Sequence, residues 1–190
     1  MIEQTLVLFK PDAVQRGIVG EILSRFEKVG LKIVALKMLN AKEEQLAEHY
    51  FKDDDWLIEK GKGIIKNKGY PKDYDPKKAG QEILDGNIKD MMISPIIAMI
   101  LEGHNAVKVV KKLVGPTNVE EAMPGTIRGD YSHDTYGLAN VSDRPILTVI
   151  HCTGEKGEEK KEIPIWFSKD EIHSYKKPEE ALHYRKHKLK

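Results

Sequence analysis

The order of strand-like and helix-like segments constrains the fold of this chain more than any other feature of its sequence. Residues 5–9 form a short apolar run that stops at a Lys-Pro-Asp turn, and residues 18–29 carry apolar side chains at helical spacing before Gly30. Residues 31–39 then alternate like a half-buried strand, and residues 41–51 form a short amphipathic helix. The chain therefore begins with the predicted order strand, helix, strand, helix.

The middle of the chain differs in composition from this beginning. Residues 52–90 are rich in Lys, Asp and Gly with balanced charges, so we expect a surface insertion with one or two modest helices. An apolar strand over 95–101 and a helix over 106–114 follow. Residues 115–134 contain too many Gly, Pro and Asp to be regular, and an ordered loop of that length is usually functional.

The last part of the chain completes the pattern with a core strand over 146–152, a charged helix over 155–163 and a basic tail over about 174–190. Two β-α-β units with helices on one face of an antiparallel sheet predict a fold of the α+β class. We expect a ferredoxin-like αβ sandwich with a four-stranded antiparallel sheet and a helical insertion. A chain of 190 residues suits one such domain, spanning 1–190, better than two separate cores.

Charge and cysteine content exclude several classes of protein. The 31 Lys and Arg balance 30 Asp and Glu, so no global field attracts the chain to nucleic acid or to an anionic membrane. The single Cys152 excludes an intrachain disulfide framework and a multi-cysteine zinc site. No apolar run approaches the ~20 residues of a membrane span, and the first ten residues are too polar for a signal peptide. We therefore expect a cytoplasmic protein without a membrane or specific nucleic-acid partner.

One of the seven histidines, His151, lies in an apolar strand, where a polar imidazole requires a structural or functional explanation. Buried histidines are usually structural, so a core histidine satisfied by a backbone partner is one interpretation. A nucleophile is the other, because a neutral imidazole held in one tautomer by a carboxylate can attack phosphorus with its free nitrogen. Glu162 is a candidate for that carboxylate, although spacing alone does not place it beside His151.

Phosphate binding requires donors, and the Gly-rich loop of a P-loop enzyme is absent. The candidate cations are Lys10, Lys111 and Arg128, each of which is more often a solvated surface charge when considered alone. Arg128 is the best of the three because it lies in a Gly-Thr-Ile-Arg-Gly-Asp stretch, where glycines permit close approach of the backbone to a ligand.

Four motifs, in order along the chain, resemble the signatures of the nucleoside diphosphate kinase family. They are FKPDAVQRG at 9–17, EHY at 48–50, PGTIRGD at 124–130 and EIPIWF at 162–167. The match runs from the first strand to Phe167 and is interrupted by the longer segment after Tyr50. The resemblance implies a ferredoxin-like sandwich that assembles as a homo-oligomer, with a hexamer expected first.

The resemblance also implies a ping-pong reaction in which a nucleoside triphosphate phosphorylates His151 and a nucleoside diphosphate then takes the phosphoryl group. Glu162 would orient His151, and the nucleotide would bring Mg²⁺ on its phosphates without a metal ligand from the protein. The family's nucleotide pocket would be formed here by residues with separate roles: Lys10 near the ribose hydroxyl, Thr117 and Arg128 near the phosphates, Tyr50, and Trp56 as a platform for the base.

The chain departs from the family pattern at four positions near His151. Thr148 replaces an asparagine, Lys111 an arginine, Thr153 a serine and Cys152 a glycine. We keep Lys111 and Thr148 as nucleotide-binding residues and predict weaker nucleotide binding, because Lys does not fork around a phosphate and a threonine hydroxyl is shorter than an amide. The side chain of Cys152 either crowds the nucleophile or lies on the other face of the strand.

Two alternatives belong to other classes of protein. A nucleotide-binding or scaffold protein that kept the fold but lost turnover would explain the four substitutions. A nucleic-acid-binding module would need exposed aromatic side chains on its central strands, where this chain has Ile, Val, Met and Leu. Retention of His151 and Glu162 together with Lys10, Thr117 and Arg128 favours the active kinase.

Overall fold

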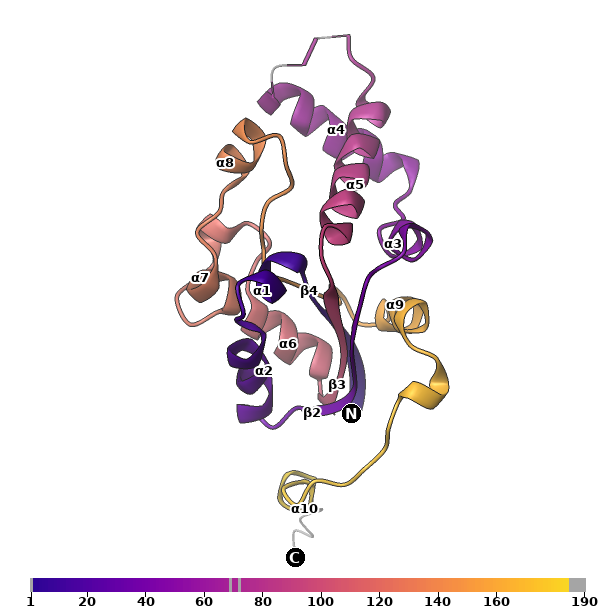
Figure 1. Ribbon diagram of the computed structural model, residues 1–190, viewed down its shortest axis with the longest axis vertical. Helices are drawn as coiled ribbons and strands as arrows, with labels where there is room; N and C mark the ends of the chain where they lie inside the picture. Colours follow the sequence, from indigo (N-terminus) through magenta and orange to yellow (C-terminus); the bar gives the residue numbers. More distant parts are fainter. Residues whose placement is uncertain (1, 69, 72, 185–190) are drawn as a thin grey trace, which may run out of the picture.

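A four-stranded antiparallel sheet forms the centre of the molecule (Figure 1), as predicted. The computed structural model describes residues 2–68, 70–71 and 73–184. The strand order is β2-β3-β1-β4, and every neighbouring pair is antiparallel. The strands are β1 (Ile2–Phe9), β2 (Lys32–Leu39), β3 (Ile96–His104) and β4 (Ile150–Cys152). The first strand of the chain is thus a central strand, with the last strand beside it.

Helices α2 (Val19–Lys28) and α6 (Ala106–Val114) cover one face of the sheet. Apolar side chains at helical spacing, such as Phe26 and Val110, pack against Val7 and Phe9 of β1, and all four are fully buried. Gly30 ends the α2 segment with a φ of +89°, a conformation that residues with a Cβ rarely adopt. Both helices were predicted within two residues of their observed bounds.

Helices α3 (Glu43–His49) and α9 (Glu159–Trp166) cover the opposite face, so the prediction of helices on one face only is wrong. Leu6 and Leu8 point to this face and are as buried as Val7 and Phe9 on the other. A strand that is apolar on both faces must be covered on both faces, because successive side chains alternate in direction. The second layer of helices is therefore a requirement of β1.

The predicted insertion over 52–90 contains two helices, α4 (Asp54–Lys68) and α5 (Pro76–Met92). They form a hairpin at the upper end of the molecule in Figure 1 and pack with their backbones in close contact. A Cβ added at Gly80 would lie 2.1 Å from the Leu57 carbonyl oxygen. The 17-residue α5 is longer than the modest helix we expected, and its last turn reaches back to α1 (Pro11–Gln15).

Short elements between β3 and α9 differ from the prediction. The stretch over 115–134 contains η1 (Val119–Glu121) and α7 (Ile127–Tyr131), and α8 (Tyr136–Val141) follows. Strand β4 is shorter than the predicted 146–152, because the chain turns sharply just before it. Helix α9 begins later than the predicted residue 155, since backbone N–H groups of Gly154 and Glu155 donate to the Glu158 carboxylate in a turn that precedes the helix.

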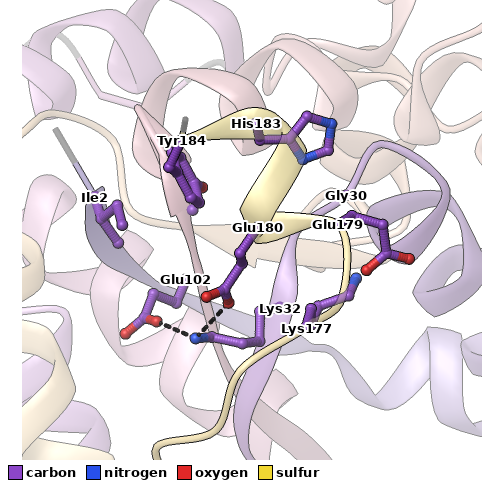
Figure 2. Close-up of a pocket in the computed structure, with 10 residues that line it drawn as sticks. Ile2, Gly30, Lys32, Glu102, Lys177, Glu179, Glu180, His183 and Tyr184 are labelled. Carbon is purple, nitrogen blue, oxygen red and sulfur yellow. Dashed lines mark hydrogen bonds and ion pairs between the residues drawn. The ribbon is translucent and has the colours of Figure 1, made fainter. Parts of the chain in front are cut away.

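The C-terminal segment runs along the edge strand β2 through η2 (Lys169–Glu171) to α10 (Glu180–His183). Lys32 anchors it, with its ammonium 2.7 Å from Glu102 and 3.1 Å from Glu180 (Figure 2). The basic cluster over 185–190, part of the predicted tail, lies outside the described residues. None of the helices in the described ranges is long and apolar enough to cross a membrane.

Candidate active site

His151 lies on β4, opposite Leu8 of the central strand, on the face of the sheet that α9 covers. Its Nε2 is 3.2 Å from a carboxylate oxygen of Glu162, on the first half of α9. An ionised carboxylate only accepts hydrogen bonds, so the shared proton belongs to Nε2 and the lone pair of the neutral ring is on Nδ1. The structure thus brings together the predicted pair and leaves one nitrogen free.

Glu162 is held by a second bond, which the Thr153 hydroxyl donates to its other oxygen over 2.6 Å. Thr153 in turn accepts from the backbone N–H of Leu6 at 3.2 Å, so this hydroxyl bridges the carboxylate to β1. Burial raises the pKa of Glu162, but the bonds from His151 and Thr153 outweigh burial and lower the pKa to about 2. The threonine therefore keeps the hydroxyl of the family's serine, and the carboxylate stays ionised.

His49, at the end of α3, also belongs to this cluster, although no sequence pattern assigned it a role. Its ring centroid is 4.5 Å from that of His151, with the ring planes at 80°. The buried indole N–H of Trp166 donates to its Nδ1 at 3.3 Å. Burial, and secondarily the nearby His151, lower the pKa of His49 to about 3. The only signal for His49 was its position beside Tyr50 in the EHY motif.

A strained turn immediately precedes β4. Val149 has a φ of +55°, which is costly for a β-branched residue, and the N–H of Ile150 donates to the Thr148 carbonyl at 2.6 Å across it. Two contacts from the residues that follow β1 hold the turn: the Asp12 carboxylate accepts from the Val149 N–H, and the Lys10 N–H donates to the Val149 carbonyl, both at 3.0 Å. The turn fixes where β4, and so His151, begins.

Arg128, on α7, lies beside β4 with 7% of its surface exposed. Its guanidinium donates to the Ile150 carbonyl at 2.9 Å, to the Gly115 carbonyl at 2.8 Å and to the Thr117 hydroxyl at 3.4 Å. The predicted phosphate-binding residues Arg128 and Thr117 are thus in contact with each other, one residue away from the histidine. Helix α7, in a stretch predicted to be irregular, is the element that places the guanidinium there.

Lys10 is buried just after β1 ends, and Tyr50 is partly buried where α3 ends. Lys10 is 8% exposed, and burial lowers the pKa of its ammonium despite attraction to Asp90 and Asp12. Burial raises the pKa of Tyr50, and Asp90 adds to this rise. Asp90, on the last turn of α5, therefore brings a carboxylate of the helical hairpin to the predicted nucleotide pocket. No sequence motif pointed to Asp90.

The other predicted site residues differ in their surroundings. Lys111 is an exposed side chain on α6, and its ammonium lies 2.5 Å from the Glu155 carboxylate. Trp56 lies on the first turn of α4, in the helical hairpin, with its backbone N–H bonded to Asp53. Thr148 is 2% exposed and belongs to the turn before β4. Their predicted contacts with a nucleotide remain predictions.

Cys152 lies on the opposite face of β4 from His151, because neighbouring side chains of a strand alternate. It packs against the core cluster of α2 and α6 rather than against the imidazole. Burial raises the pKa of its thiol to about 11. The side chain that replaces the family's glycine is therefore accommodated away from His151.

His49, His151 and Glu162 are the one group of three metal-ligating side chains in the described part of the chain, with ligand atoms within 4.8 Å of one another. The bond from Trp166 places the proton of His49 on Nε2, so neither nitrogen of that ring offers a free lone pair. A nitrogen-rich set also suits Mg²⁺ poorly, since that ion prefers oxygen ligands. These residues fit a nucleophile with its supports better than a metal centre.

Comparison with known proteins identifies the family. A sequence model described as nucleoside diphosphate kinase matches residues 3–56 and 51–172. A nucleoside diphosphate kinase of Pyrobaculum aerophilum is 42% identical over 181 residues, which cover 90% of this chain and 98% of that protein. The crystal structure of an NDP kinase from the same organism has a TM-score of 0.84 at 40% identity, covering 92% of this chain and 100% of that one.

A nucleoside diphosphate kinase from Borrelia burgdorferi, solved with bound vanadate and ADP as a transition-state mimic, is similar with a TM-score of 0.79 and 36% identity. The match covers 96% of this chain and 97% of that one. The fold, the ordered motifs and the histidine with its carboxylate agree with these matches over nearly the whole chain. The chain belongs to the nucleoside diphosphate kinase family, a family of phosphotransferase enzymes.

Proposed function

We propose that this kinase transfers phosphoryl groups through His151 in a ping-pong reaction. The observation that carries the proposal is the 3.2 Å bond between Nε2 of His151 and Glu162, because it leaves the lone pair of the ring on Nδ1. An imidazole with one nitrogen bound to a carboxylate and the other free is equipped to attack phosphorus.

In the proposed first step, Nδ1 of His151 attacks the terminal phosphorus of a nucleoside triphosphate. The new N–P bond forms as the bond to the bridging oxygen breaks, and the nucleoside diphosphate leaves with that oxygen. The ring keeps its Nε2 proton and becomes positive, and the ionised Glu162 balances this charge. A second nucleoside diphosphate then attacks the phosphorus with a terminal phosphate oxygen, which restores the neutral ring.

The phosphates would bind to Arg128 and Thr117, which are in contact and lie beside the strand of His151. Lys111 would add a charge from α6. Lys10 would bind the ribose hydroxyl, and Tyr50 would support the same pocket. In the similar Borrelia burgdorferi structure the fold holds ADP and vanadate, which supports a nucleotide at the corresponding place here. Because phosphoryl transfer depends on positioning and charge, such donors suffice for the chemistry.

Base, metal and assembly complete the proposal. Trp56 would form a platform for the base, and Thr148 would add a contact near the phosphates. The family needs a divalent cation, and we propose that Mg²⁺ binds to the phosphates of the substrate. The protein would supply the basic side chains that surround these phosphates. We further propose a homo-oligomer, a hexamer first, located in the cytoplasm.

Incubation with γ-labelled ATP and Mg²⁺ tests the proposal. The wild-type protein should acquire acid-labile, alkali-stable label that passes to an added nucleoside diphosphate, and His151→Ala should acquire none. Absence of label in a folded wild-type protein that still binds nucleotide would contradict it. That outcome would indicate a binding protein with a silent site.

A further inference from the structure

A buried imidazole lies against the nucleophile, and the proposed reaction gives it no task. His49 is 9% exposed and contacts three other rings. Its ring centroid is 4.5 Å from that of His151, 5.1 Å from that of Tyr50 and 5.6 Å from that of Trp166. The closest of the three contacts is therefore the one to His151.

The protonation state of His49 follows from its partner. The indole of Trp166 can only donate, so Nδ1 of His49 is an acceptor and its single proton is on Nε2. That Nε2–H is buried and has no hydrogen-bond partner among the described residues. The titratable and charged groups that act on the ring are His151, Glu162 and Lys52, with the phenol of Tyr50 in ring contact, and burial outweighs the attraction of Glu162. His49 is thus a neutral ring of fixed tautomer.

We propose that His49 is a positioning residue, whose ring holds the plane of the His151 imidazole while Glu162 holds its Nε2. The proposal rests on the proposed role of His151 as the phosphorylated residue. A hydrogen bond at 3.2 Å restrains one atom of a ring but permits the ring to tilt about it. A second ring packed against it at 80° removes that tilt and keeps Nδ1 directed at the incoming phosphorus.

His49 is itself held in place by its helix and by Trp166. Helix α3 ends at His49. The indole of Trp166, at the end of α9 and 2% exposed, packs against the His49 ring and donates a hydrogen bond to it. The same helix α9 carries Glu162, so the two restraints on His151 are built on one rigid element and its neighbour. Misplacement of a reacting group by about 1 Å can slow a reaction about 100-fold, so such restraints matter for rate.

Nuclear magnetic resonance of the ¹⁵N-labelled wild-type protein tests the assignment without any variant. We expect His49 to show an unprotonated Nδ1 and a protonated Nε2 that do not change between pH 5 and 9, because the pKa of its ring is about 3. Titration of His49 in this range, or a proton on its Nδ1, would overturn the proposal.

Single-turnover phosphorylation by γ-labelled ATP then tests the role. Below the melting temperature of every variant, His49→Ala should be phosphorylated at least about tenfold more slowly than wild type with an unchanged nucleotide KM. His49→Phe, which retains a neutral ring, should recover the rate to within about threefold. Leu46→Ala is the matched control, since Leu46 is a fully buried aliphatic residue of the same helix and has no ring to pack against His151.

The outcomes separate the two proposals. An unlabelled wild type would mean that His151 is not the phosphorylated residue, whatever the variants do. A labelled wild type with His49→Ala as fast as Leu46→Ala would mean that His49 only stabilises the fold. Equal slowing in His49→Ala and His49→Phe would contradict a role for the ring. If His49→Ala does not fold, the comparison of His49→Phe with wild type and the nuclear magnetic resonance result decide the matter.

Discussion

Replacement of Glu162 by Gln keeps the size of the side chain but removes its charge. The carboxylate accepts two bonds, from Nε2 of His151 at 3.2 Å and from the Thr153 hydroxyl at 2.6 Å, and its side chain is 14% exposed. An amide has one acceptor oxygen and one donor nitrogen. Gln can therefore accept a hydrogen bond from only one of the two donors, and its NH₂ group faces the other donor without forming a bond. The substitution therefore affects both stability and the nucleophile.

Two estimates of the stability effect agree. Hydrogen bonds to charged groups contribute about 1.5–3 kcal/mol and neutral ones about 0.5–1.5 kcal/mol, so weakening two bonds costs about 2 kcal/mol. The fall of the Glu162 pKa from 4.5 to about 2 corresponds to at most about 3 kcal/mol, at ~1.36 kcal/mol per pKa unit, because part of the fall comes from attraction to charged histidine rings. Because the folded pKa is lowered, this stability is present above pH 4.5 and is lost as the pH falls through 2.

Urea unfolding of wild type and Glu162→Gln at pH 7 and pH 3 measures the effect. We expect a difference in the free energy of unfolding of about 2–3 kcal/mol at pH 7 and about half of that at pH 3. Phosphorylation should slow about 10- to 100-fold, because the positive ring loses its counter-charge. Glu27→Gln, an exposed glutamate of α2, is the control and should change neither quantity. A difference at pH 7 that persists unchanged at pH 3 would refute the reasoning.

Three further predictions follow from other contacts. Gly80→Ala should destabilise the protein in urea unfolding, because the new Cβ forces α4 and α5 apart. Gly63→Ala on α4, where nothing lies within 4 Å of the new Cβ, should instead stabilise it by up to about 1 kcal/mol. Lys32→Met should speed proteolysis of the C-terminal segment by releasing Glu180 while leaving kinase activity unchanged, because β3 and β1 separate the strand of Lys32 from the strand of His151. Lys111→Arg should lower the nucleotide KM a few-fold through a bidentate phosphate contact, and an unchanged or higher KM would show that Lys111 does not bind phosphate.

Much of the fold was predictable because local patterns determine it. Apolar spacing located α2 and α6, and Gly30 marked where the α2 segment ends. The covering of both sheet faces was predictable in principle, since residues 5–9 form a continuous apolar run, which is the pattern of a strand buried on both sides. We instead assumed the simpler arrangement with helices on one face.

The length of β4 was not predictable from its own residues. Residues 146–149 are apolar apart from Thr148 and resemble a strand, but Val149 adopts a positive φ, and its N–H donates to the Asp12 carboxylate, 137 positions earlier in the chain. Long-range contacts of this kind are invisible to periodicity. The short β4 matters because it sets the position of His151.

In the candidate site, the sequence indicated which residues take part, but not which residues surround them in the fold. The sequence identified His151, Glu162 and Arg128 as candidates, and the structure brings these side chains to neighbouring positions. The surroundings of His49 arise only when α3 and α9 pack side by side, so its neighbours were not evident from the EHY motif. The orientation of Cys152, left open by the sequence, follows from strand alternation once the face of His151 is known.

The position of the phosphoryl group on the imidazole tests the central claim most directly. The bond between Nε2 and Glu162 predicts that phosphorylation by ATP occurs on Nδ1 of His151, with the proton still on Nε2. Phosphorus and nitrogen nuclear magnetic resonance of the phosphorylated, ¹⁵N-labelled protein distinguishes the two isomers through the nitrogen that couples to phosphorus. Phosphate on Nδ1 of His151 would support the account, and phosphate on Nε2 or on another residue would contradict it.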